Sequence, residues 1–110
     1  RENHSSAADL ATLLEELATG ETLGPAVADP VWASLERQEH LDGIARYLPA
    51  TASYAGKCGD DAPAGRYAHD CALIGDGERR VIVAIMTDGA GGFEAVSRTG
   101  AALYQALPHA

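Results

Sequence analysis

The fold follows mainly from residues 67–87, which read YAHDCALIGDGERRVIVAIMT. Two segments, Tyr67 to Ile74 and Val81 to Thr87, are rich in the apolar and branched residues that are typical of strands. Between them, Gly75-Asp76-Gly77-Glu78 predicts a hairpin turn, so the two strands should run antiparallel. Because Val81 to Thr87 is nearly all apolar, we expect it to be a central strand of the sheet.

A third strand, short and built from small residues, is predicted just before these two, from Ala52 to Cys58. Three consecutive strands with hairpin-length connections indicate an antiparallel sheet, and helices must cover the apolar faces of such a sheet. The expected fold class is therefore α/β in the broad sense and α+β in the strict sense.

Two helices are predicted before the strands. Ser6-Ala7-Ala8-Asp9 has the pattern of an N-cap followed by an acidic residue, and leucines then recur at helical spacing as far as Gly20. We expect Gly24-Pro25 to break the chain and Asp29-Pro30 to begin a second, shorter helix that ends near Gln38.

An irregular connection is predicted from His40 to Ala52, and a last helix is predicted after Gly91-Gly92. That helix carries one apolar stripe, made of Phe93, Val96, Gly100, Leu103 and Leu107. The expected order is helix, helix, three strands, helix.

Composition narrows the classes of function. The 110 residues are 46% hydrophobic and carry a formal net charge of -8, which fits one domain or part of one. The acidic charge argues against binding to nucleic acid or to an anionic membrane, and no apolar run approaches the roughly 18 residues that span a bilayer. The start at Arg1 has neither an initiator Met nor the apolar core of a signal peptide, so we expect a processed product or a fragment, which leaves export open.

Metal binding is not predicted. Cys58 and Cys71 are too few for a disulfide scaffold and do not have the spacing of a zinc site. The four histidines do not have metal-ligand spacing either, and these are His4, His40, His69 and His109. We therefore expect neither a metal nor a cofactor.

Several segments, read in order, resemble the C-terminal half of class A β-lactamases, and so the wider group of serine β-lactamases and penicillin-binding proteins. They are Ser6 to Gly20, Ile44 to Pro49, Ala55 to Gly59, His69 to Ile74 and Val81 to Gly89. One strand in that family carries Lys-Thr-Gly or Lys-Ser-Gly, and the motif here stands as Lys57-Cys58-Gly59. The resemblance implies that residues 1–110 are the C-terminal part of a β-lactamase-like domain with an antiparallel sheet covered by helices.

The same resemblance implies a role for four consecutive residues. Lys57 would be catalytic, supplying positive charge beside the active-site serine. Cys58, Gly59 and Asp60 would bind substrate: position 58 normally donates a hydroxyl hydrogen bond to the substrate carboxylate, Gly59 would allow the substrate to approach, and Asp60 would offer its backbone N–H to an oxyanion. A thiol is a weaker donor than a hydroxyl, so Cys58 departs from the family pattern.

Other parts of the family site are absent from this chain. The Ser-x-x-Lys nucleophile motif, the Ser-Asp-Asn loop and the omega-loop glutamate all lie before the point that matches Arg1. Ser34, Ser53 and Ser97 are not followed by lysine at the third position. Catalysis would therefore need the N-terminal half of the domain or a second copy. The substrate implied is a small β-lactam-like amide or ester attacked to give an acyl-enzyme, and the location implied is secreted or periplasmic.

Alternative interpretations remain open. The chain could belong to a β-lactamase-like protein that binds a ligand or partner without hydrolysis, or it could be an α+β interaction module. Lys57 could be an ordinary lysine that protects an edge strand. The two cysteines could be buried thiols or a cross-strand disulfide, and Cys58 could be a reactive thiol.

Some charged residues also have two interpretations. The adjacent acids Asp60 and Asp61 are typical of a turn, although they could act as an acid and base pair. Arg46 or Arg66 could replace the carboxylate-binding arginine of the family, or be a surface residue. Among the histidines, only His69 lies near the motif strand in the sequence pattern.

Overall fold

The computed structural model describes residues 4–61, 64–89 and 91–107. Its elements, in chain order, are α1 (Ala7–Thr19), α2 (Pro25–Glu36), the 3-10 helix η1 (Ile44–Tyr47), β1 (Ser53–Asp60), β2 (Tyr67–Gly75), β3 (Arg80–Asp88) and α3 (Gly92–Ala106). The predicted order and the α+β class with an antiparallel sheet are confirmed. Among the described residues, no helix combines the length and the apolar content needed to cross a membrane.

The sheet has the order β1-β2-β3, and both pairs of neighbouring strands are antiparallel. The predicted hairpin is confirmed: Gly75 pairs with Arg80, and the Asp76 N–H donates to the Arg79 carbonyl over 3.1 Å. The prediction that Val81 to Thr87 is central is wrong for the described sheet, in which β2 is central and β3 is an edge strand. An apolar run indicates that both faces of a strand are buried. In β3 the helices on the two sides bury both faces, although no further strand in the described part of the chain pairs with its outer edge.

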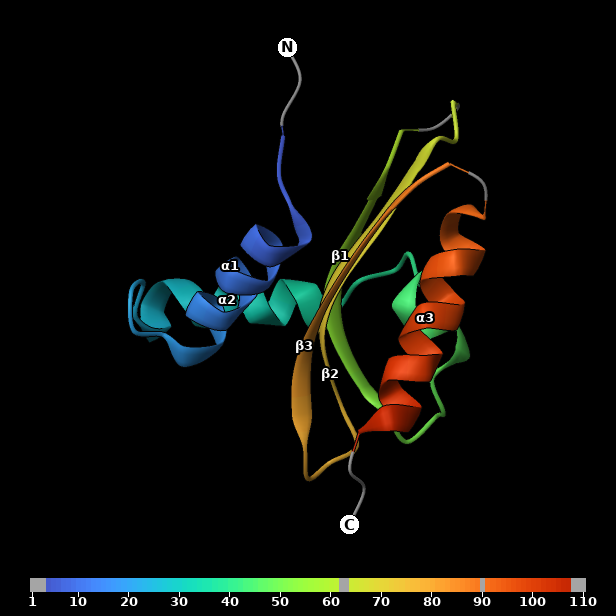
Figure 1. Ribbon diagram of the computed structural model, residues 1–110. Coiled ribbons are helices and arrows are strands. Elements are labelled where there is room, and N and C mark those ends of the chain that lie inside the picture. The colour runs from blue at the N-terminus through green and yellow to red at the C-terminus, as the bar shows by residue number, and fades with distance from the viewer. Residues whose placement is uncertain (1–3, 62–63, 90, 108–110) are drawn as a thin grey trace.

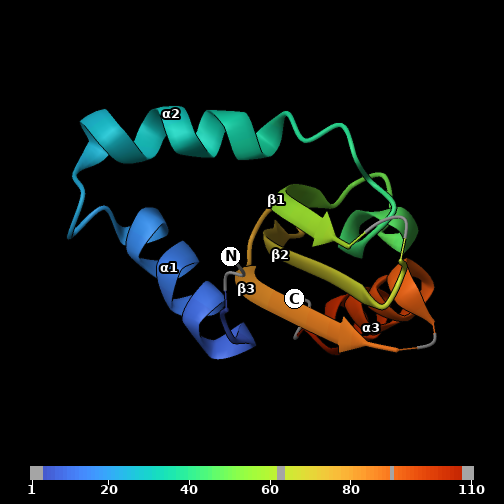
Figure 2. The same ribbon diagram turned by 90° about the horizontal axis from the view of Figure 1, so that it is seen from above.

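Helices cover both faces of the sheet (Figures 1 and 2). On one face lie α1 and α2, and on the other lie η1 and α3. Alternate residues of β2 point to each side: Ala72 belongs to the core under α3, whereas Cys71 packs against the cluster of Leu14 and Leu17 from α1. The molecule therefore has three layers, with one small core on each side of the sheet.

The larger core lies between the sheet and α3. Ile44 from η1 and Val96 from α3 are fully buried there, and Gly100 lets the two elements approach, because a Cβ at that position would lie 3.1 Å from the Ile44 Cα. The predicted apolar stripe of α3 is partly wrong, since Leu103 is 42% exposed and Tyr104 is buried in its place. The inner face of α3 is turned towards η1 as well as the sheet, which rotates Leu103 to the margin of the core.

The first helix agrees with its sequence signals. The Ser6 side chain accepts a hydrogen bond from the Asp9 N–H over 3.1 Å, and Gly20 ends the helix at φ 69° with its N–H bonded to the Glu16 carbonyl. The prediction for the second helix is wrong at its start, because α2 begins at Pro25 and contains Pro30.

The positions of two prolines, Pro25 and Pro30, explain where α2 begins. Proline at the first helical position needs no backbone N–H, so Gly24-Pro25 begins the helix instead of breaking the chain. Pro30 removes one hydrogen bond of the second turn, and the helix continues through it because packing holds both halves. Trp32, just after Pro30, donates from Nε1 to the Leu17 carbonyl of α1 over 2.9 Å, which fixes α2 against its neighbour.

Candidate active site

The Lys57-Cys58-Gly59 motif lies on β1, an edge strand of the described sheet. Successive side chains of a strand point to opposite faces, so Lys57 and Cys58 diverge. Lys57 is exposed on the face of α1 and α2, and its Nζ donates to the Cys58 carbonyl. Cys58 is 7% exposed and lies on the face of η1 and α3, opposite Asp70 of β2.

The family resemblance implies that Lys57 and Cys58 line a cleft, but neither side chain lines any of the four cavities described for residues 4–61, 64–89 and 91–107. A Cβ at Gly59 would meet no atom within 4 Å, and Asp60 is exposed. The motif therefore presents an open strand edge, and the second wall of a cleft is not formed by the described residues.

Cys58 has a histidine neighbour that the sequence did not reveal. The Sγ of Cys58 lies 2.8 Å from Nδ1 of His40, and the other ring nitrogen, Nε2, lies 3.6 Å from a carboxylate oxygen of Asp42. Gln38 donates from Nε2 to the Gly56 carbonyl over 3.3 Å, and the same atom lies 4.0 Å from the thiol. These residues precede Cys58 by 16 to 20 positions. No fixed spacing could have indicated the contact, which arises only when the connection packs beside β1.

Asp70 anchors the connection that carries His40. Its carboxylate is 2% exposed and accepts hydrogen bonds from the Ile44 N–H over 2.8 Å and from the Tyr54 hydroxyl over 2.9 Å. Burial raises the pKa of Asp70, and burial together with the Asp70 charge raises the pKa of Tyr54. A Cβ at Gly43 would collide with the Asp70 carboxylate, so this approach requires glycine.

A second anchor comes from α3. The Ser97 hydroxyl is buried and lies 2.7 Å from the carbonyl oxygens of both Asp42 and Gly43. The edge of the His40 ring also packs against Phe93 of α3, with 5.3 Å between ring centroids. The backbone around His40 is therefore held from the sheet side and from the helix side.

The two cysteines are free thiols and do not form a disulfide. They lie on neighbouring strands but face opposite sides of the sheet. Cys71 is partly buried, and its Sγ donates to the Lys57 carbonyl over 3.7 Å. Burial raises the pKa of Cys58 and of Cys71, and for Cys58 the nearby charge of Lys57 acts in the opposite direction. Of the interpretations left open by the sequence, the disulfide is excluded.

The remaining predicted candidates have structural partners. Asp61 accepts from the Tyr67 N–H over 2.8 Å, as expected of a turn residue. Arg66 pairs with Asp88 over 2.7 Å, and Arg46 lies 3.6 Å from Glu94 of α3. His69 accepts from the Thr87 N–H on the neighbouring strand over 3.2 Å. His109 falls outside the described residues, which contain no group of three or more side chains able to hold a metal.

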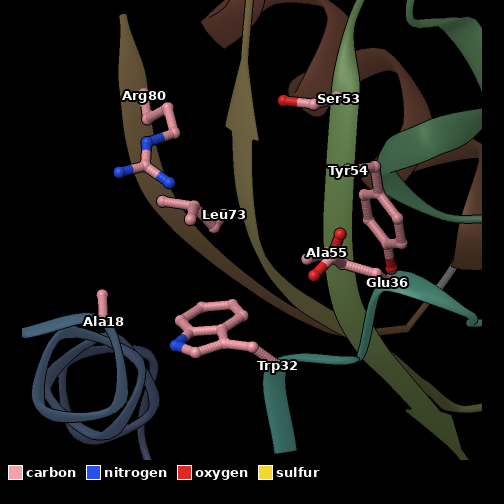
Figure 3. A pocket seen from close by; sticks show the side chains of 8 residues that line it. All are labelled: Ala18, Trp32, Glu36, Ser53, Tyr54, Ala55, Leu73 and Arg80. Atoms are coloured by element: carbon pink, nitrogen blue, oxygen red, sulfur yellow. The ribbon is translucent and has the colours of Figure 1, made fainter. Parts of the chain in front are cut away.

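A separate cavity of about 320 Å³ lies between the sheet and the two helices of the other face (Figure 3). It is lined by Ala18, Trp32, Glu36, Ser53, Tyr54, Ala55, Leu73 and Arg80. It opens beside the first residues of β1, whereas the motif occupies the last ones. Its polar side chains include Ser53 but no histidine or lysine that could serve as a base, so its lining does not form a nucleophilic site.

Comparison with known proteins identifies the family. A protein-family model described as "Beta-lactamase enzyme family" matches residues 1–107. The chain therefore belongs to the beta-lactamase enzyme family, as its motifs predicted. A search of curated proteins gave no match.

Solved structures agree with this assignment. PBP-A is 26% identical, with a TM-score of 0.83 over 93% of this chain and 39% of that chain. The beta-lactamase from Sphaerobacter thermophilus DSM 20745 is 24% identical, with a TM-score of 0.85 over 96% of this chain and 41% of that chain. A beta lactamase from Burkholderia vietnamiensis is 21% identical, with a TM-score of 0.80 over 96% of this chain and 42% of that chain. The chain thus spans about 40% of the length of these relatives and matches the C-terminal part of their fold.

Proposed function

We propose that this chain forms one wall of an acyl-transfer site of the serine β-lactamase and penicillin-binding type. The observation that carries the proposal is the Lys57-Cys58-Gly59 motif on the open edge strand of a sheet with this family's fold. A mutant of PBP-A has been solved as an acyl-enzyme complex with penicillin-G, so a similar fold accommodates that chemistry. In this chain Lys57 would supply positive charge to the site, while Cys58, Gly59 and the backbone of Asp60 would contact a β-lactam or a related amide or ester.

The nucleophile in this proposal comes from outside the chain. Ser34, Ser53 and Ser97 are not followed by lysine at the third position, and the match covers about 40% of each relative. The second wall, beside the motif on β1, would come from the N-terminal half of the same domain or from a second copy. The same missing part would also be seated against β3, the opposite edge of the sheet. An apolar groove of about 420 Å³ follows that edge, lined by Val81, Ile82, Val83, Ala84, Leu103, Ala106 and Leu107. Export to the periplasm or the exterior is part of the same proposal.

One observation favours a second candidate function, ligand or partner binding without hydrolysis. The thiol of Cys58 is directed to His40 and not to the face that carries Lys57. A side chain engaged there would have to rotate before it could donate to a substrate carboxylate. In this second candidate function, the protein would keep the binding cleft of the family but would not hydrolyse the bound ligand.

The test compares the full-length protein with a Lys57→Ala variant. We expect the native protein to hydrolyse nitrocefin or to form a penicillin adduct detectable by intact mass. The variant should lose at least about a hundredfold in rate, as is common when a group that stabilises developing charge is removed. Lys57 is the only lysine of the chain, so the control is an arginine of the hairpin, Arg79→Ala, which should keep full activity. A folded native protein that neither turns over nitrocefin nor forms an adduct would leave the binding function as the better proposal.

A further inference from the structure

The neighbours of Cys58 have the arrangement that a thiol nucleophile requires. A weak nucleophile becomes effective when a base lies within hydrogen-bond reach and a third group orients that base. Here Nδ1 of His40 lies 2.8 Å from Sγ of Cys58, and Nε2 on the other side of the ring faces the Asp42 carboxylate at 3.6 Å. All three residues belong to this chain.

We propose that Cys58 is a nucleophilic thiol with His40 as its general base and Asp42 as a positioning residue. Its substrates would be small molecules that carry an electrophilic carbon, acyl or alkyl, bonded to a leaving group. In the reaction Sγ bonds to that carbon, and the leaving group departs with the electron pair of the broken bond. The thiol proton passes to Nδ1 of His40, and the imidazolium then gives a proton to the leaving group or to water.

The base is held in place before any substrate arrives. Gln38 is tied to the Gly56 carbonyl of β1, and the imidazole packs edge-on against Phe93. Two residues after His40, the carbonyl of Asp42 accepts a hydrogen bond from the buried Ser97 hydroxyl over 2.7 Å. Such fixed geometry lowers the entropic barrier to proton transfer, since the ring does not need to find the thiol.

Burial and access have opposite effects on this thiol. Burial raises the pKa of Cys58, which disfavours a standing thiolate and makes proton transfer to His40 during attack the important event. The His40 side chain itself is 47% exposed, so the thiol lies directly behind a group in contact with solvent. In this proposal a small electrophile reaches the thiol along the exposed side of the ring.

Cys71 provides an internal control in the same molecule. Burial raises the pKa of this thiol too, and its described hydrogen bond is to the Lys57 carbonyl over 3.7 Å. It is more exposed than Cys58, so accessibility alone predicts that Cys71 reacts faster. The reverse order of reactivity would identify an activated Cys58.

The experiment measures alkylation of both thiols in the full-length protein by iodoacetamide, whose iodide is the leaving group. Trypsin cleaves after Lys57, Arg66 and Arg79, so the two cysteines fall in separate peptides, residues 58–66 and 67–79, and mass spectrometry follows each one. We expect Cys58 to react at least about tenfold faster than Cys71, and His40→Asn to slow Cys58 by about ten- to a hundredfold. The rate of Cys71 should not change.

A second variant is needed as a control in case His40→Asn disrupts the packing of the connection that carries His40. Asp42→Asn leaves the imidazole and the backbone in place and should slow Cys58 by about two- to fivefold, the range of an exposed charge pair. The proposal is overturned if Cys58 reacts more slowly than Cys71 in the native protein, or if neither variant slows Cys58. The outcome does not depend on β-lactam turnover, because each rate is assigned to a single peptide of this chain.

Discussion

Cys58 occupies the middle of the family motif, and its Sγ lies 2.8 Å from Nδ1 of His40. The motif that contains Cys58 is contiguous, so it could be found by inspection, and it led to the correct family. The contact between Cys58 and His40 depends on how the irregular connection before β1 packs, and nothing in the local sequence reports that packing. The sequence therefore predicted the strand and its motif but missed the imidazole beside the thiol.

A threonine at position 58 tests whether the departure from the family pattern limits activity. A hydroxyl is a stronger donor than a thiol, so Cys58→Thr should increase kcat/KM for carboxylate-bearing β-lactams by about fivefold, equivalent to about 1 kcal/mol. Nitrocefin hydrolysis by the full-length protein measures this, with Cys71→Thr as the matched control. An unchanged or lower rate would instead favour a function of the thiol itself.

Asp70 makes a prediction about pH because burial raises its pKa. A raised pKa in the folded state means that the folded protein holds this proton more tightly than the unfolded chain. The resulting stability is fully present below the ordinary aspartate pKa of about 4 and is lost as pH rises through the raised value. Asp70→Asn cannot titrate, so the melting temperature of the native protein relative to this variant should fall between about pH 4 and neutrality.

Thermal melts at a series of pH values, followed by circular dichroism, measure that difference. The exposed Asp29→Asn in α2 is the control, and it should show a smaller change across the same range. If the relative stability of the native protein rose with pH, the hydrogen bonds from Ile44 and Tyr54 would outweigh burial, and the direction of the pKa shift would be wrong.

At the scale of elements, capping signals were reliable and proline was ambiguous. Ser6 and Gly20 bound α1 as their residue types predicted, because each supplies a specific hydrogen bond or backbone conformation. The start of α2 was placed at Asp29-Pro30, although Gly24-Pro25 carries the same kind of signal. Two prolines with similar local patterns cannot be ranked from sequence, since tertiary packing against α1 decides which one lies inside the helix.

The contact between α3 and η1 gives the next prediction. Alanine is favoured over glycine within a helix by about 1 kcal/mol, but a Cβ at Gly100 would lie 3.1 Å from both the Cα and the Cγ2 of Ile44. Ile44 is fully buried and its N–H is bonded to Asp70, so it cannot easily move. Overpacking should win, and Gly100→Ala should lower the free energy of unfolding by about 1 to 3 kcal/mol.

Urea unfolding of the variant and of its neighbour Thr99→Ala separates the two effects. Thr99 is exposed, so its substitution reports helix propensity alone and should be neutral or stabilising by about 0.5 kcal/mol. A stabilised Gly100→Ala variant would show that η1 yields to α3 and that the close approach is not required.

At the scale of the whole molecule, the sequence indicated which segments other elements would cover. It did not indicate which strands would lie at the edges of the sheet. The apolar run of β3 correctly indicated burial on both faces, yet it also suggested a central position that the described sheet does not provide. Leu103, expected in the core, lies instead at the apolar groove beside β3. Both differences occur on the same side of the molecule, which is where the proposed second wall would be seated.

The final prediction concerns this edge of β3. Val81 to Met86 contain neither a charge nor a proline, and a free edge of this kind favours the addition of another strand. The apolar side chains of β3 are already buried or half-buried, so an added strand would mainly pair the backbone groups of this edge and cover the apolar groove beside it, gaining at most roughly 1.5 to 3 kcal/mol for each apolar side chain that it newly buries. We therefore expect the isolated 110-residue chain to self-associate as its concentration rises, as measured by sedimentation. Ala84→Lys should suppress the association, whereas the same substitution at the exposed Ala102 of α3 should not. A compact monomer at all concentrations, with a cooperative melt, would contradict the idea that β3 is an interface for a second wall.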